Sequence, residues 1–158
     1  MKRVAIYVDV SNLYYCIYNK HKGKLDYAKL LEFLGPIGDI RLSKAYGAQV
    51  RDEAAPFIEI LKTLGFEPHY KEPKFYGQHE GKADWDVGIA IDMIKDMDHY
   101  DMAVLCSADG DMIPVVEYLR ERGKDVVILG AGISCELQEY ATTCIEIPMS
   151  MVIKKGKR

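Results

Sequence analysis

Long apolar runs are missing from this sequence of 158 residues. The longest such segment, residues 126–133, is far shorter than the roughly 20 residues that a membrane-spanning helix needs. A basic start, Met1-Lys2-Arg3, is followed by a short apolar run that ends at Asp9, too early for the core of a signal peptide. We therefore expect a cytoplasmic protein with no membrane partner.

The sequence also lacks a Cys-x-x-Cys pair and an excess of positive charge. Without such a pair, neither a zinc knuckle nor a redox couple is indicated. We expect each cysteine to be a small buried residue: Cys16, Cys106, Cys135 and Cys144. The formal net charge of −3 argues against a protein that coats nucleic acid. It does not exclude a nuclease, because carboxylates that bind a metal offset the basic charge along a substrate path.

No internal repeat or low-complexity segment is present, and the length suits one domain, which we place at residues 1–150 with a basic C-terminal tail at 151–158. Short apolar runs alternate with segments of helical periodicity. Strands are predicted at 4–8, 40–48, 67–71, 102–106, 125–129 and 144–147. Helices are predicted after Ser11 or Asn12 and at 26–34, 52–64, 84–97, 112–122 and 135–141. This alternation predicts a three-layer α/β domain with a mainly parallel central sheet flanked by helices.

Aspartates follow two of the predicted strands. Asp9 ends the first strand, and Asp109 and Asp111 come directly after the strand at 102–106. Ligands of such folds bind beyond the C-terminal ends of the strands, and neighbouring strands lie about 4.8 Å apart. If these two strands are neighbours, the carboxylates converge and repel one another unless a cation is bound. Mg²⁺ or Mn²⁺ suits a site of oxygen ligands that is poor in cysteine.

A fourth carboxylate is available where the helix near residue 84 begins, and there Asp84 and Asp86 are alternatives. Asp92 is turned about 120° from Asp86 and lies about 9 Å further along the helix, so the two cannot easily share an ion. Asn12 and Ser107 could supply neutral oxygens, or hydrogen bonds to ligand carboxylates or to metal-bound water.

Ordinary structural roles are the alternative for each aspartate taken singly. Asp9 could simply end a strand, Asp84 could be a helix N-cap, and Asp109-Gly110-Asp111 could be a turn with Asp111 as the cap. The joint placement of these residues after two strands and at one helix start favours a metal site.

Aromatic and basic residues are interleaved in two parts of the chain, a mixture suited to single-stranded nucleic acid. The aromatic residues that could stack on bases are Tyr14, Tyr15, Tyr18, Tyr70, Phe75 and Tyr76, beside Lys71, Lys74 and Lys82. Packing in the core is the alternative for about half of them.

Three ordered motifs resemble a known family. They are IYVDVSNL at residues 6–13, KADWDVGIAIDMI at 82–94 and LCSADGDMIP at 105–114. Together they resemble the NYN domain, the PIN-like nuclease group that includes the LabA/DUF88 proteins, over nearly the whole chain. The resemblance implies a PIN-like α/β nuclease fold, a divalent cation, and RNA, single-stranded or structured, as the substrate.

By position, the resemblance matches the family's acidic quartet to Asp9, Asp86, Asp109 and Asp111. It matches flanking polar positions to Asn12 and Ser107, which we expect, together with Lys82, to bind the substrate. The spacing from Lys82 is one residue longer than the family's usual one, which leaves Asp84 as the alternative to Asp86.

The expected function is a metal-dependent ribonuclease whose aspartate cluster holds one or two Mg²⁺ or Mn²⁺ ions and hydrolyses phosphodiester bonds. Lys82 could neutralise a phosphate oxygen of the substrate. The alternative is an RNA-binding or regulatory protein that keeps the fold without cleaving, acting through a partner or as a homodimer. A metal-dependent phosphatase is less favoured, because it needs a second aspartate two residues after Asp9, where Ser11 stands.

Overall fold

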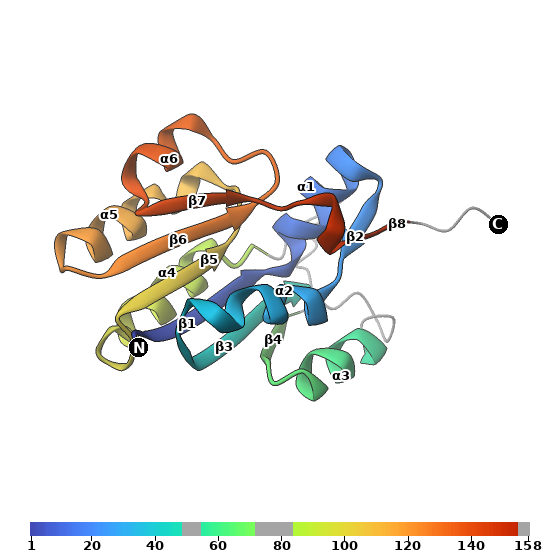
Figure 1. Cartoon of the computed structure of the whole chain (residues 1–158), viewed down its shortest axis with the longest axis horizontal. Coiled ribbons are helices and arrows are strands. Elements are labelled where there is room, and N and C mark those ends of the chain that lie inside the picture. The colour runs from blue at the N-terminus through green and yellow to red at the C-terminus, as the bar shows by residue number, and fades with distance from the viewer. Residues whose placement is uncertain (49–54, 72–83, 155–158) are drawn as a thin grey trace, which may run out of the picture.

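The computed structural model describes residues 1–48, 55–71 and 84–154. Six strands form one sheet: β1 (Arg3–Asp9), β3 (Asp39–Ala48), β4 (Glu67–Lys71), β5 (Met102–Cys106), β6 (Asp125–Gly130) and β7 (Thr143–Glu146). They lie in the order β4-β3-β1-β5-β6-β7, and every neighbouring pair is parallel (Figure 1). The predicted α/β fold with a parallel central sheet is confirmed, and each predicted strand is found within one residue of its expected start.

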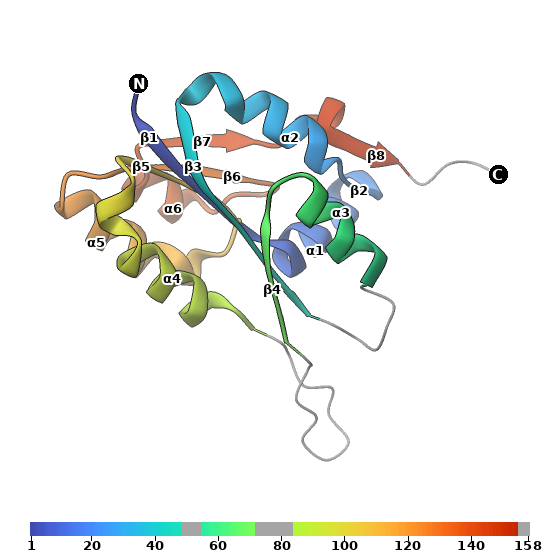
Figure 2. The same cartoon turned by 90° about the horizontal axis from the view of Figure 1, so that it is seen from below.

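Helices cover both faces of this sheet (Figure 2). The first face carries α1 (Val10–His21), α2 (Tyr27–Leu34) and α3 (Ala55–Thr63). The second face carries α4 (Asp86–Lys95), α5 (Ile113–Glu121) and α6 (Cys135–Tyr140). Short 3-10 helices are η1 (Gly35–Ile37), η3 (Met97–His99), η4 (Gly110–Met112) and η5 (Met149–Met151).

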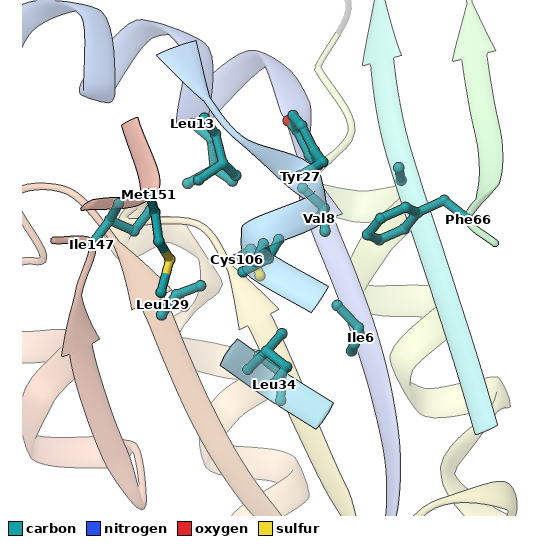
Figure 3. Close-up of a cluster of buried hydrophobic side chains, with 14 of the residues drawn as sticks. Ile6, Val8, Leu13, Tyr27, Leu34, Phe66, Cys106, Leu129, Ile147 and Met151 are labelled. Atoms are coloured by element: carbon teal, nitrogen blue, oxygen red, sulfur yellow. The ribbon is translucent and has the colours of Figure 1, made fainter. Parts of the chain in front are cut away.

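The first strand is buried on both faces because its side chains alternate between two apolar layers. Val4, Ile6 and Val8 belong to the layer under α1 and α2, and Ala5 and Tyr7 belong to the layer under α4 and α5. All five are fully buried. Figure 3 shows the first layer, in which Leu13 of α1 and Leu34 of α2 point toward the strands. The sequence is apolar without interruption at residues 4–8 because both faces of this strand are buried.

A second, two-stranded antiparallel sheet was not predicted. It pairs β2 (Gly23–Leu25) with β8 (Val152–Lys154). Met151, directly before β8, is only 4% exposed and packs in the first layer. Residues 151–154, expected to begin the basic tail, are therefore part of the fold, while 155–158 lie outside the described residues.

Three further expectations need correction or qualification. Asp9 itself, not Ser11 or Asn12, is the N-cap of α1. Cys135 is exposed, whereas Cys106 is buried as expected and Cys16 and Cys144 are partly buried. Within the described ranges, no helix is both long enough and apolar enough to cross a membrane. The cytoplasmic location stays a prediction.

The order of the strands reverses between β1 and β5. From β1 the chain first adds β3 and β4 on one side, and then adds β5, β6 and β7 on the other. Val8 of β1 pairs with Cys106 of β5, so the C-terminal ends of these strands lie side by side. Such a switch point is where open α/β sheets bind ligands.

Candidate metal centre

Asp9 is placed at the switch point by two local features. It ends β1, and its Oδ1 accepts a hydrogen bond from the backbone N–H of Asn12 (3.1 Å), which caps α1. The residue is only 6% exposed. Burial, and after it the negative charges of Asp84 and Asp109, raise the pKa of its carboxyl group to about 6, although hydrogen bonds from the backbone oppose this shift. A buried, largely uncompensated carboxylate is a good candidate for a cation ligand.

The loop after β5 holds the next two aspartates in a hydrogen-bonded turn. Ser107 is fully buried, and its Oγ accepts from the backbone N–H of Asp109 (3.2 Å). Oδ1 of Asp109 then accepts from the backbone N–H of Asp111 (2.9 Å), which makes Asp109, rather than Asp111, the N-cap of η4. The turn expected at residues 109–111 is therefore present, and it also brings the carboxylates of Asp109 and Asp111 to one place.

Asn12 joins the two strand ends. Its Oδ1 accepts from the backbone N–H of Ala108 (3.0 Å), which links the first turn of α1 to the loop after β5. The structure thus gives Asn12 and Ser107 contacts to the backbone that carries the aspartates. These hydrogen bonds fix the backbone of the loop after β5.

The start of α4 brings a third carboxylate to the same place. The backbone N–H of Asp86 donates to Oδ1 of Asp84 (2.8 Å), and the N-cap position of α4 is Trp85, not Asp84 as expected. Burial, and after it the negative charges of Asp109 and Asp84, together raise the pKa of Asp86 to about 7. Asp9 and Asp86 are therefore two acidic groups with raised pKa values.

Carboxylate oxygens of Asp86, Asp109 and Asp111 lie within 4.8 Å of one another. An ion with metal–oxygen distances of about 2.1 Å has opposite ligands about 4.2 Å apart, so this group fits Mg²⁺ or Mn²⁺ after a small contraction. Asp84 is not a member of the group, which favours Asp86 over Asp84 as the ligand. Asp9 is also outside it, but it lines the same cavity.

This cavity, called here the acidic cavity, has a volume of about 620 Å³. It is lined by Asp9, Ser11, Asn12, Tyr15, Ala48, Asp84, Trp85, Asp86, Asp109 and Asp111. All four carboxylates of the expected quartet therefore share one cavity. Asp92 does not take part, because its Oδ2 accepts from the Tyr46 hydroxyl (2.6 Å).

Trp85 is a wall of the acidic cavity that sequence reasoning missed. Its Nε1–H donates to the carbonyl oxygen of Gly47 at the end of β3 (2.8 Å), which fixes the start of α4 against the sheet. Nζ of Lys71 lies 4.3 Å from the centre of its ring. The signal was available, since this is the one tryptophan of the chain and it stands between the two candidate aspartates.

Lys82, the expected phosphate contact, lies outside the described residues, as do Lys74, Phe75 and Tyr76. Among the other aromatic candidates, Tyr14, Tyr15 and Tyr18 are exposed at 60%, 69% and 39%.

Comparison with known proteins assigns the fold to a family. The family described as NYN domain matches residues 3–148. The chain is 29% identical to the low amplitude and bright protein LabA of Synechococcus elongatus, over 92% of this chain and 83% of that protein. It is also 29% identical to an uncharacterized protein of Methanocaldococcus jannaschii, over 98% of this chain and 59% of that protein.

A solved structure confirms the architecture. The crystal structure of a protein of unknown function from Vibrio parahaemolyticus superposes with a TM-score of 0.88 and 29% identity. The match covers 96% of each chain. The fold described above is therefore shared nearly from end to end.

Proposed function

We propose that this chain, which belongs to the NYN domain family, is a divalent-metal-dependent ribonuclease. NYN domains belong to the PIN-like nuclease superfamily and act on RNA. The family supplies the general class of activity, and the aspartates of this chain supply the chemical argument for the reaction and its site.

The observation that carries the proposal is the convergence of three carboxylates. Asp86 comes from the start of α4, and Asp109 and Asp111 come from the turn after β5, yet their oxygens lie within 4.8 Å of one another at the switch point of the sheet. Mutual repulsion makes this arrangement unfavourable without a cation. A pure RNA-binding surface has no need of it, because carboxylates also repel phosphate.

The residues divide into three roles. We assign Asp9, Asp86, Asp109 and Asp111 as ligands of Mg²⁺ or Mn²⁺. When bound, the metal supplies an activated water and stabilises the negative charge that develops on the phosphate. Asn12 and Ser107 hold the loop backbone that presents the ligands. Lys82 is proposed to neutralise a phosphate oxygen of the substrate.

The test is cleavage of end-labelled single-stranded and structured RNAs with Mn²⁺, Mg²⁺ or EDTA. We expect cleavage with a metal, none in EDTA, and a loss of at least about 100-fold in Asp9→Asn and in Asp109→Asn. Asp26→Asn is the matched control, because Asp26 is also an N-cap whose Oδ1 accepts a backbone N–H (3.2 Å), at the start of α2. It should cleave like the wild type.

Each outcome has a distinct meaning. Equal cleavage by the wild type and Asp109→Asn would place the active site elsewhere. Binding of metal and RNA without any cleavage would support the alternative, a regulatory RNA-binding protein, for which a second copy of the chain stays a predicted partner. Unchanged turnover in Lys82→Met would remove only the role of that lysine.

A further inference from the structure

A second cavity lies beside the acidic cavity, and half of its lining residues are aromatic. This aromatic cavity has a volume of about 590 Å³, and Tyr14, Tyr15, Tyr27, Phe57 and Tyr70 line it. The two cavities share Ser11, Tyr15 and Ala48 as lining residues. They are therefore adjoining parts of one surface depression. The volume falls within the range of about 300–1,000 Å³ found for sites that bind small organic groups.

The outer wall of the aromatic cavity is a face of α1 that the core does not use. Ser11, Tyr14 and Tyr15 are three and four residues apart, so they lie on one side of the helix. The tyrosines are 60% and 69% exposed, whereas Leu13 and Ile17 of the same helix are fully buried. Large aromatic side chains left open to water on this face need another explanation than packing.

The inner wall is ordered by contacts between rings. Tyr27 is only 8% exposed and meets Phe57 edge to face, with 5.3 Å between the ring centres. On the outer wall, Tyr14 stacks on Tyr18, with 6.3 Å between the ring centres and 13° between the ring planes. These contacts restrain three rings of the cavity before any ligand binds, which lowers the entropic cost of binding.

One polar group in this wall lacks a partner. The hydroxyl group of Tyr70 is buried and forms no hydrogen bond with the described part of the chain. A buried hydroxyl without a partner is unfavourable. A ligand with hydrogen-bonding groups on its edge and flat apolar faces would satisfy both this hydroxyl, after a small movement of the ring, and the tyrosine faces.

We propose that the aromatic cavity binds one unstacked nucleobase of a single-stranded RNA, next to the phosphate that is cleaved in the acidic cavity. A nucleobase has two apolar faces and a polar edge, and bases stack on aromatic side chains in single-strand sites. A paired base within a duplex offers no free face. The proposal rests on the ribonuclease function and narrows its substrate to unpaired RNA.

The shared residues explain how one nucleotide reaches both cavities. Tyr15 and Ser11 line both cavities, so a base in the aromatic cavity and its own phosphate in the acidic cavity would both lie beside them. Lys24 also lines the aromatic cavity and is exposed. Its ammonium group can contact the sugar-phosphate chain that leaves the base.

The experiment measures how much the bases contribute to binding. Two fluorescein-labelled probes are titrated in EDTA, where no hydrolysis is expected: a short oligoadenylate and a base-free ribose phosphate chain of equal length. The acidic cluster repels both probes alike, so the ratio of their Kd values reports the bases alone. We expect the wild type to bind the oligoadenylate about five- to 150-fold more tightly. A duplex should bind no better than the base-free chain.

Variants locate the effect. In Tyr14→Ser and Tyr15→Ser this ratio should fall toward one with little change for the base-free chain, whereas Tyr15→Phe should keep it. Tyr140→Ser is the matched control, an exposed tyrosine on α6 that lines neither cavity. An unchanged ratio in both serine variants, or an equal loss for both probes, would overturn the proposal.

The two proposals can fail separately. A wild type that cleaves RNA but shows a ratio of one would leave the ribonuclease function intact and remove the nucleobase site. A wild type that binds the oligoadenylate more tightly than the base-free chain but never cleaves RNA would support the nucleobase site and remove the ribonuclease function.

Discussion

Replacing Asp9 with asparagine should make the metal-free protein more stable. Oδ1 of Asp9 caps α1 by accepting the N–H of Asn12, and an asparagine side chain keeps this oxygen. What the substitution removes is a buried negative charge that faces the charges of Asp84 and Asp109. A catalytic or metal-binding group that costs stability is expected where function needs an uncompensated charge.

The magnitude follows from the raised pKa of Asp9. The pKa is about 6 in the folded protein and about 3.9 in an unfolded chain, and each unit is worth 1.36 kcal/mol. Because the folded state holds the proton more tightly, the native carboxyl group costs stability above pH 6, and this cost is lost as the pH falls toward 4. Asp9→Asn should therefore gain about 2–3 kcal/mol at pH 8 and about half of that at pH 5.

Urea and thermal unfolding in EDTA at both pH values measure this gain. For a chain of this size it corresponds to a rise in Tm of roughly 5–10 °C at pH 8. Asp26→Asn, which keeps a similar cap at the start of α2, should change little at either pH. A variant at Asp9 that is no more stable than the wild type at pH 8 would refute the reasoning.

Three further predictions concern the metal, the loop and the C-terminus. Mn²⁺ affinity should rise from pH 5 to pH 8, because protons compete with the ion for Asp9 and Asp86, whose pKa values are about 6 and about 7. An Mn²⁺ affinity that calorimetry finds to be the same at both pH values would contradict this. Asn12→Ala removes the acceptor of the Ala108 backbone N–H and should lower the free energy of unfolding in urea by about 1–3 kcal/mol. It should also weaken Mn²⁺ binding. A variant as stable as the wild type would show that this hydrogen bond is dispensable. Met151→Ala should lower the free energy of unfolding by about 2–4 kcal/mol. Met149→Ala should lower it little, because Met149 is 46% exposed. Equal effects of the two substitutions in thermal unfolding would argue against a folded segment at 149–154.

Much of the fold could be predicted because its strands are buried on both faces. Such strands appear in a sequence as unbroken apolar runs, and the run at 4–8 and the run at 102–106 are clear examples. The pair of β2 and β8 could not be predicted in this way. Each of these strands is only three residues long, and the two lie near opposite ends of the chain, so no local sequence pattern indicates that they pair.

The site was predictable in part for a related reason. Asp9 ends one strand and Asp109 and Asp111 follow another, and parallel strands bring such positions to one edge. The choice between Asp84 and Asp86 depends on where α4 begins, and that start is fixed by the contact of the Trp85 indole with Gly47, which is distant in sequence. The aromatic cavity depends in the same way on contacts between α1, α2 and β4 that spacing alone does not reveal.

The central claim is that this cluster of aspartates holds a divalent cation, and a titration with Mn²⁺ tests it most directly. The EPR signal of free Mn²⁺ should show one or two ions bound per wild-type chain and per Asp26→Asn chain. Binding should be strongly weakened in Asp109→Asn, which removes a charge from the group of three carboxylates. Undiminished binding in Asp109→Asn, or no binding to the wild type at pH 8, would contradict the account.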